Sequence, residues 1–234
     1  MLDRIERSYN SQKQFVSDAS HELRTPISVI RGYTDMLKRW GKDDPEVLEE
    51  GIEAISQETE GMKDLVESLL FLARHDKKTL MMEISVFDSS ELLWEVQKEE
   101  TMVHTGFSFE IRDMDKVNIK ADRNMMKQVL RILCDNAVKY SAPESTVTLS
   151  CNDELNGYCC LSVRDTGQGI SPEDLPKIFD RFYRSDEARR KDTGGHGLGL
   201  SIARIIVVAH GGKIKVRSKQ GIGTVFSVLL PKEI

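Results

Sequence analysis

Apolar residues near the start of the chain recur every seven residues, which is the spacing of helices that pack along a common seam. Two heptad positions carry them: the first holds Leu2, Tyr9, Val16, Leu23, Ile30 and Leu37, and the second holds Ile5, Gln12, Ala19, Pro26, Tyr33 and Trp40. Pro26 and Gly32 alone interrupt this stretch. The pattern predicts one long helix from Leu2 to Trp40.

A turn and a second helix are expected next. Residues 41–45 end the first helix, and Asp44 and Pro45 suit the N-cap and the first turn of a new one. The apolar series of the second helix is Leu48, Ile52, Ile55, Thr59, Met62, Val66, Leu69 and Ala73. The two helices would form a hairpin with outward apolar stripes that a dimeric four-helix bundle would bury.

The hydrophobic pattern changes after residue 78, where short alternating runs replace the heptads. Strands are expected at residues 107–111, 147–151, 159–164, 213–218 and 224–230. Helices are expected at residues 90–102, 124–140 and 200–210. The predicted fold is therefore a helical hairpin domain over residues 1–78, followed over residues 79–234 by an α/β sandwich of a mostly antiparallel sheet and a helical layer. Residues 171–199 are basic, glycine-rich and irregular, and we interpret them as a mobile lid.

Composition narrows the class of protein. The 234 residues are 39% hydrophobic, 6% aromatic and 30% charged, which excludes fibrous and low-complexity proteins. The formal charge of −5 argues against a general nucleic-acid binder. No apolar run approaches the roughly 18 residues of a membrane-spanning helix, so the chain as given is expected to be soluble. Cys134, Cys151, Cys159 and Cys160 form no metal-binding spacing and are expected to be buried, reduced thiols.

The first candidate for chemistry is His21, which the heptad register places almost opposite the apolar seam. A solvent-facing imidazole with a pKa of about 6.5 is largely neutral at physiological pH and can act as a nucleophile. Glu22 could accept a hydrogen bond from one ring nitrogen, and Thr25, one turn further on, could orient a water molecule. Pro26 should bend the helix beside the histidine. An exposed histidine on a helix is by itself more often without a chemical role.

A second cluster points to phosphate binding. Residues 165–169 follow a predicted strand and residues 194–200 open a predicted helix, so that bare backbone amides face a ligand. Neither segment has the spacing of a Walker or dinucleotide-binding loop. Asn136, Lys139 and Tyr140 share one helix face and offer an amide oxygen for a metal, a cation for phosphate and a ring for a base. Each also has a structural interpretation, as a capping amide, a solvated lysine and a core tyrosine.

Together these segments resemble the catalytic core of sensor histidine kinases. Residues 21–26 resemble the H box of that family, 136–140 the N box, and 165–169 the first glycine box. Residues 179–184 resemble the F box, 195–200 the second glycine box, and 221–224 the last one. The resemblance implies a dimerisation and histidine-phosphotransfer hairpin over residues 1–78, and an ATP-binding domain of the gyrase and chaperone type over residues 79–234.

The resemblance also implies roles for individual residues. Asp165 would bind the adenine amino group, Asn136 would bind Mg²⁺, and Lys139 and Arg184 would lie near the phosphates of ATP. The full nucleotide-binding set would be Asn136, Lys139, Tyr140, Asp165, Gly167, Gly169, Arg184, Gly195, Gly197, Leu198, Gly199, Leu200 and Thr224. Ile132 departs from the family pattern, because many relatives carry a second asparagine there.

The reaction implied is transfer of the γ-phosphoryl group of ATP to His21, with Glu22 as general base or as the residue that orients the ring. The phosphoryl group would then pass to an aspartate on a response-regulator receiver domain. Thr25 would support hydrolysis of that aspartyl phosphate. The expected partners are a second copy bound through residues 1–78 and the regulator, with no nucleic acid. The chain would be the cytoplasmic portion of a membrane sensor, attached only through upstream segments. Two alternatives stay open: a gyrase-type ATPase or clamp, and a binding scaffold whose kinase is weakened by Ile132.

Overall fold

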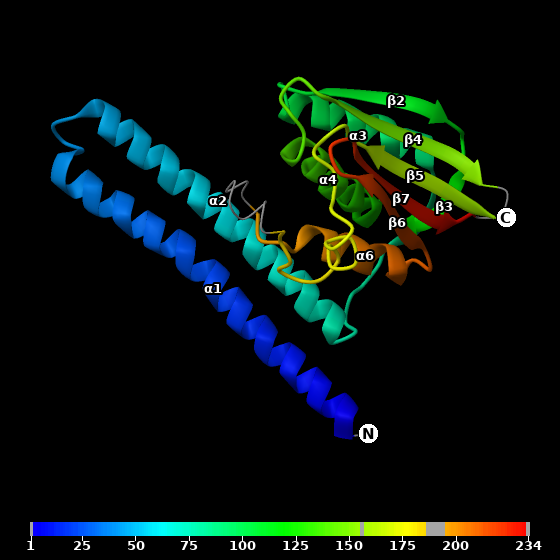
Figure 1. Cartoon of the computed structure of the whole chain (residues 1–234), viewed down its shortest axis with the longest axis horizontal. Helices are drawn as coiled ribbons and strands as arrows, with labels where there is room; N and C mark the ends of the chain where they lie inside the picture. Colours follow the sequence, from blue (N-terminus) through cyan, green and yellow to red (C-terminus); the bar gives the residue numbers. More distant parts are fainter. Residues whose placement is uncertain (1, 155–156, 186–194, 233–234) are drawn as a thin grey trace. The chain divides into compact units, whose positions relative to one another are not determined.

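The computed structural model describes residues 2–154, 157–185 and 195–232 (Figure 1). The chain divides into two compact units, one built essentially from the residues up to Thr79 and the other beginning at Leu80. In the described residues, no helix is long and apolar enough to cross a membrane.

The first unit is the predicted helical hairpin. Helix α1 spans Leu2–Trp40 without interruption at Pro26, and α2 spans Pro45–Asp76. The Asp44 carboxylate caps α2 by accepting hydrogen bonds from the backbone N–H groups of Glu46 and Val47 at 3.0 and 3.4 Å. The cap satisfies amides that the helix start leaves without partners, which is why the sequence signal at this boundary is reliable.

The face of α2 that packs on α1 is marked by buried residues that the predicted apolar series does not contain. The buried positions of α2 are Gly51, Leu65 and Leu72, which are separated by multiples of seven residues. A Cβ on Gly51 would lie 2.7 Å from Leu37 Cδ2, so this series faces α1. Ile52, which belongs to the predicted apolar series, lies one residue from Gly51, and its side chain is 56% exposed. This part of the series therefore faces outward, and periodicity alone does not say which residues of α2 face α1.

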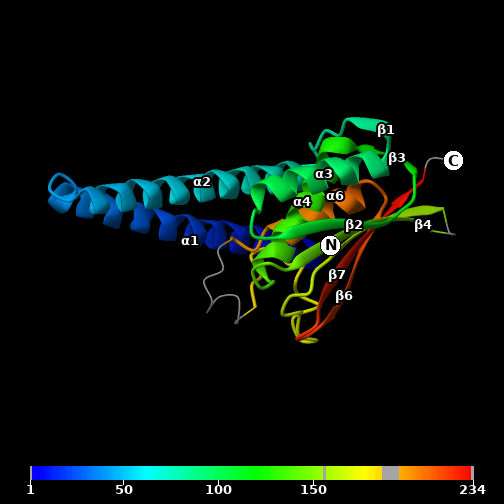
Figure 2. The same ribbon diagram turned by 90° about the horizontal axis from the view of Figure 1, so that it is seen from above.

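The second unit is built on a five-stranded mixed sheet, as predicted. Its strands, in spatial order, are β2 (Ser108–Met114), β4 (Thr146–Glu154), β5 (Tyr158–Arg164), β7 (Gly223–Pro231) and β6 (Lys213–Lys219). The pair β2–β4 is parallel and the other pairs are antiparallel. Figure 2 shows one face of this sheet covered by three helices, α3 (Ser89–Val103), α4 (Arg123–Lys139) and α6 (Gly199–Ala209).

A second, two-stranded sheet was not predicted. Strands β1 (Ile84–Asp88) and β3 (Asn118–Asp122) pair antiparallel, and each leads directly into a helix. Asp88 caps α3 and Asp122 caps α4 through their carboxylates. Each strand has only five residues, and in β1 the side chains do not alternate between buried and exposed. The period-2 signal that reveals longer strands is therefore missing from the sequence.

The remaining expectations fall inside the second unit. All four cysteines are buried and form no disulfide, in agreement with the prediction. Residues 171–185 and 195–198 of the expected lid form turns and bends rather than a helix or strand. Residues 186–194 of that segment lie outside the described residues.

Candidate functional site

The hairpin presents His21 and Thr25 to solvent. Both side chains are exposed on α1, and the spacing of four residues puts them one helical turn apart on the same side. Glu22, between them in sequence, is half-buried. The hairpin therefore offers a nucleophile, a carboxylate and a hydroxyl within little more than one turn of helix.

In the second unit, Asp165 is the most constrained of the candidate residues. Only 8% of its surface is exposed, and its Oδ1 accepts hydrogen bonds from the backbone N–H groups of Gly167 at 2.9 Å and Thr224 at 3.1 Å. Burial raises the pKa of Asp165, and the two hydrogen bonds act in the opposite direction. The carboxylate is thus held in one orientation and keeps its other oxygen as an acceptor.

Backbone contacts join the segments around Asp165. A Cβ on Gly167 would overlap the carbonyl oxygen of Tyr140, and that oxygen accepts a hydrogen bond from Gln168 N at 3.0 Å. Gly169 has φ +71°, and a Cβ on it would overlap the carbonyl oxygen of Lys219 in the same way. Only glycine allows these approaches, so the predicted first glycine box is packed between the end of α4 and the turn before β7.

The turn between β6 and β7 closes the other side of Asp165. Gly223, at φ +135°, lies against the Asp165 carbonyl, and Thr224 N binds the Asp165 side chain. Ser218 links this turn to the first glycine box, because its hydroxyl accepts a hydrogen bond from Ile170 N at 2.8 Å and lies 2.9 Å from the Thr224 hydroxyl.

Asn136 offers a ligand suited to a hard cation. Its amide nitrogen donates to the Ile132 carbonyl at 2.8 Å, so its oxygen is turned away from that carbonyl. The side chain is half-buried near the end of α4. An amide oxygen is among the ligands that Mg²⁺ accepts in proteins, so the residue present fits the implied ion.

Two cationic side chains come together beside Asn136. Burial, and then the charge of the nearby Arg184 guanidinium, lower the pKa of Lys139 to about 8, against the opposing effect of Asp135. The Lys139 Nζ also lies 5.5 Å from the centre of the Tyr140 ring. Two positive charges held close together attract an anion, so this part of the site suits phosphate.

The second glycine segment leads into α6. Gly197, at φ +69°, accepts a hydrogen bond at its carbonyl from Phe182 N at 3.0 Å, and Leu198 is the buried N-cap of α6. No side chain caps this helix start, so its first amides remain as donors. Gly199 and Leu200 form the first turn and are half-buried, while Gly195 is exposed at φ +83°. Gly194, which precedes them in the predicted loop, lies outside the described residues.

The geometry agrees with the families that the chain matches. Residues 121–234 match the family described as "Histidine kinase-, DNA gyrase B-, and HSP90-like ATPase", and residues 11–78 match the "His Kinase A (phospho-acceptor) domain". The catalytic domain of the histidine kinase ThkA is 32% identical, with a TM-score of 0.55, and the match covers 64% of this chain and 99% of that domain. The chain belongs to the sensor histidine kinases.

Two longer relatives extend the match to the hairpin. "Sensor histidine kinase YkoH" of Bacillus subtilis (strain 168) is 44% identical over 226 residues, which are 94% of this chain and 48% of that protein. "Signal transduction histidine-protein kinase ArlS" of Staphylococcus epidermidis is 38% identical over 232 residues, which are 99% of this chain and 51% of that protein. The chain therefore spans about half the length of these curated relatives.

Ile132, the position at which this histidine kinase departs from the family pattern, contacts both α6 and Asn136. Ile132 is half-buried, and its Cγ2 would lie 3.1 Å from a Cβ on Gly199. Its backbone carbonyl is the acceptor for the Asn136 amide. Ile132 therefore packs against the start of α6 as well as supporting the candidate metal ligand.

Sequence reasoning missed two serines that lie at the kinase site. In the part of the chain that the structure describes, the Ser141 hydroxyl is buried without a hydrogen-bond partner next to Gly167. Ser218 joins two loops, as described above. Neither serine stands in a motif, and both contacts join residues distant in sequence, so no local signal could have found them.

Proposed function

We propose that this histidine kinase core transfers the γ-phosphoryl group of ATP to His21 and then passes it to an aspartate of a response-regulator receiver domain. The observation that carries the proposal is the pairing of Lys139 with Arg184 in the unit that also holds the buried Asp165 carboxylate. A buried acceptor and two cations match the base and the phosphates of a nucleotide. The exposed His21 on the hairpin supplies the nucleophile.

Asp165 binds the base in this proposal. Its carboxylate is oriented by the amides of Gly167 and Thr224 and accepts a hydrogen bond from the adenine amino group. The Tyr140 ring contacts the base. Gly167 and Gly169 let the neighbouring segments approach closely enough to shape this end of the site.

The phosphates bind at the end of α4 and the start of α6. Lys139 and Arg184 offset their charge, and the amides of the first turn of α6 donate to them. The residues from this second glycine segment are Gly195, Gly197, Leu198, Gly199 and Leu200. Asn136 would hold Mg²⁺, which when bound neutralises charge that develops on the phosphate oxygens.

At the hairpin, an imidazole nitrogen of His21 attacks the γ-phosphorus, the bond from that phosphorus to the bridging oxygen of ADP breaks, and ADP leaves. Glu22 orients the ring and takes the proton that the imidazole loses. The phosphohistidine then donates the phosphoryl group to a carboxylate of the regulator. Thr25 holds the water that later hydrolyses the aspartyl phosphate.

The assembly we propose is a homodimer through residues 1–78. Support comes from the outward apolar stripe of the hairpin, where Ile52 on α2 and Val16 on α1 are 56% and 58% exposed. Histidine kinase ThkA, solved "in complex with response regulator protein TrrA", is 29% identical with a TM-score of 0.75, and the match covers 99% of this chain and 65% of that one. A receiver domain is the corresponding partner here. We further propose that this core is the cytoplasmic portion of a longer sensor protein held in a membrane, since the chain spans about half the length of the relative named "Sensor histidine kinase YkoH".

The test is to incubate the purified chain with Mg²⁺ and ATP labelled in the γ-phosphoryl group. Label on the protein that survives alkali and is lost in acid is expected, and it should pass to a receiver domain added afterwards. Hydrolysis of ATP with no label on the protein would instead support the gyrase-type ATPase.

A further inference from the structure

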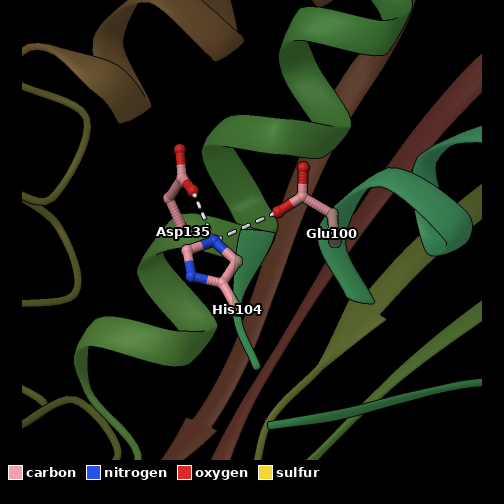
Figure 3. Close-up of side chains that lie close together, drawn as sticks. All are labelled: Glu100, His104 and Asp135. Atoms are coloured by element: carbon pink, nitrogen blue, oxygen red, sulfur yellow. Dashed lines mark hydrogen bonds and ion pairs between the residues drawn. The ribbon is translucent and has the colours of Figure 1, made fainter. Parts of the chain in front are cut away.

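Three potential metal ligands meet where the end of α3 packs on α4 (Figure 3). Glu100 and His104 lie one helical turn apart, and Asp135 projects from α4. The His104 Nε2 atom lies 3.3 Å from Glu100 Oε2 and 3.2 Å from Asp135 Oδ1. One oxygen of each carboxylate and one imidazole nitrogen all lie within 4.8 Å of one another. Two helices thus direct three donor atoms toward one point.

The Glu100 carboxylate is buried and poorly satisfied by the protein. Its side chain is only 6% exposed, and it makes no hydrogen bond within the described ranges. The nearest cation other than His104 is Arg131, whose Nε lies 4.0 Å away and whose Nη2 binds Glu99 at 2.7 Å. Burial raises the pKa of the Glu100 carboxyl, and a further cation on the side where it faces His104 would stabilise its charged form.

A protonated His104 cannot meet that need for both carboxylates. The Nε2 atom carries at most one proton, and the Asp135 oxygen already accepts it at 3.2 Å. A single cation between the three atoms would satisfy all of them. Around a tetrahedral ion with bonds of about 2.0–2.1 Å, ligand atoms are separated by about 3.3–3.4 Å. The two separations from His104 Nε2 are close to that value, and the third separation, between the two carboxylate oxygens, is no more than 4.8 Å.

We infer that Glu100, His104 and Asp135 bind a divalent transition-metal ion, with Zn²⁺ as the reference ion. An imidazole with two carboxylates suits Zn²⁺ and its neighbours in the first row, whereas Mg²⁺ and Ca²⁺ prefer oxygen ligands alone. The His104 ring is held in place against Phe109, with ring centres 6.0 Å apart. The Asp135 side chain is 63% exposed, which leaves a solvent-facing position for entry of the ion and for a water ligand.

A bound ion would tie the end of α3 to α4, next to the candidate magnesium ligand Asn136 in sequence. The site is separate from the nucleotide chemistry, because none of its three ligands belongs to the proposed nucleotide-binding set. It therefore does not depend on the proposed kinase function.

The test uses the full chain, stripped of metal with a chelator and dialysed, in the absence of nucleotide. Calorimetric titration with Zn²⁺ should give one equivalent of binding, and Co²⁺ should produce the visible absorption bands of a tetrahedral site. At a free Zn²⁺ concentration of about 100 Kd, the melting temperature should rise by roughly 5–10 °C. An unchanged melting temperature with no Co²⁺ bands would overturn the inference.

Two variants and a matched control locate the site. Asp135→Asn alters an exposed side chain, so it should fold normally and lose at least tenfold in Zn²⁺ affinity; His104→Gln should lose the Co²⁺ bands as well. The control is His75→Gln, because His75 faces a single carboxylate, Asp76, at 3.4 Å. Wild-type affinity in Asp135→Asn, or loss of the site in His75→Gln alone, would place the metal elsewhere and reject this assignment.

Discussion

Ile132 on α4 packs against Gly199 at the start of α6, with its Cγ2 3.1 Å from where a Cβ on that glycine would lie. Helix α4 carries Asn136 and Lys139, and α6 carries the amides proposed to bind phosphate. The contact therefore joins the two elements that would hold the triphosphate. The apolar side chain of Ile132 therefore has a packing role at a position where many relatives carry an asparagine.

Replacing Ile132 should affect stability before affinity. In Ile132→Asn, an amide replaces the methyl groups at this contact, and the free energy of unfolding should fall by ~1 kcal/mol, which lowers the melting temperature by about 2–4 °C. Mg-ATP affinity should not improve. Ile132→Val, which keeps Cγ2, is the control and should remain close to wild type. Tighter nucleotide binding in Ile132→Asn without loss of stability would show instead that this side chain faces the ligand.

His21→Gln should abolish acid-labile phosphorylation while leaving nucleotide affinity within about twofold of wild type. The reason is that His21 belongs to one compact unit, whereas Asn136, Lys139 and Asp165 belong to the other. Label incorporation and nucleotide binding are measured on the same preparation. His75→Gln, at another histidine of the hairpin, serves as the control. Wild-type label in His21→Gln would move the phosphoacceptor to another residue.

Thr25→Ala should separate the two proposed activities of the hairpin. The imidazole needs no hydroxyl to attack ATP, so autophosphorylation should survive, whereas dephosphorylation of the regulator should slow by at least tenfold. The comparison is Ser28→Ala, which removes the next exposed hydroxyl along α1, bonded only to the Arg24 carbonyl. Equal dephosphorylation rates in Thr25→Ala and wild type would remove Thr25 from the mechanism.

Lys139 should make nucleotide binding dependent on pH. Its pKa of about 8 in the folded chain, against an ordinary 10.5, means that half of the side chains are neutral near pH 8. A bound triphosphate favours the charged form, so Mg-ATP binding at pH 8 should take up about half a proton, and affinity should fall as the pH rises above 8. Calorimetry in buffers of different ionisation enthalpy measures this uptake. Lys139→Met should abolish it, and an unchanged uptake would assign the proton to another group.

The same shift has a consequence for folding without ligand. Because the folded pKa of Lys139 lies below the unfolded one, the unfolded chain binds more protons between pH 8 and 10.5. Lys139 therefore lowers the free energy of unfolding below pH 8, and this destabilisation disappears as the pH rises from 8 to 10.5. Bound phosphate removes the same penalty at neutral pH.

An ion-pair cluster between α3 and α4 should set part of the acid stability. Hydrogen bonds from Lys127 and then Arg123 lower the pKa of Glu95 to about 2 from an ordinary 4.5. Its stabilising contribution is therefore present above pH 4.5 and is lost as the pH falls toward 2. Glu95→Gln should lower the melting temperature at pH 7 and have no effect near pH 2. A difference from wild type that is the same at both pH values would contradict the assignment.

The sequence predicts this fold best where a local signal exists. The ends of the hairpin helices were predicted from the cap at Asp44 and Pro45, and the five long strands from alternation. The packed face of α2 could not be predicted from the apolar series, because Gly51, which contributes no apolar side chain to the pattern, faces Leu37. Strands β1 and β3 were missed because their pairing joins segments too short to show a period.

For the candidate site, the residue types were predictable but their contacts were not. The motifs point to Asp165 and Lys139, yet the hydrogen bond from Thr224 to Asp165 and the approach of Arg184 to Lys139 depend on segments brought together by folding. The cluster of Glu100, His104 and Asp135 gives no sequence signal beyond a spacing of four residues. Such juxtapositions come from tertiary packing, which local patterns do not encode.

The main chain, rather than the side chains, sets the spacing around Asp165. Gly167, Gly169 and Gly223 each lie where a Cβ would overlap a carbonyl oxygen of another segment, namely that of Tyr140, Lys219 or Asp165. Few substitutions are therefore tolerated at these three positions. Any side chain at these three positions would push whole segments apart, so a new ligand preference has to arise at neighbouring positions, such as Tyr140, whose side chains can vary while the loops keep their paths.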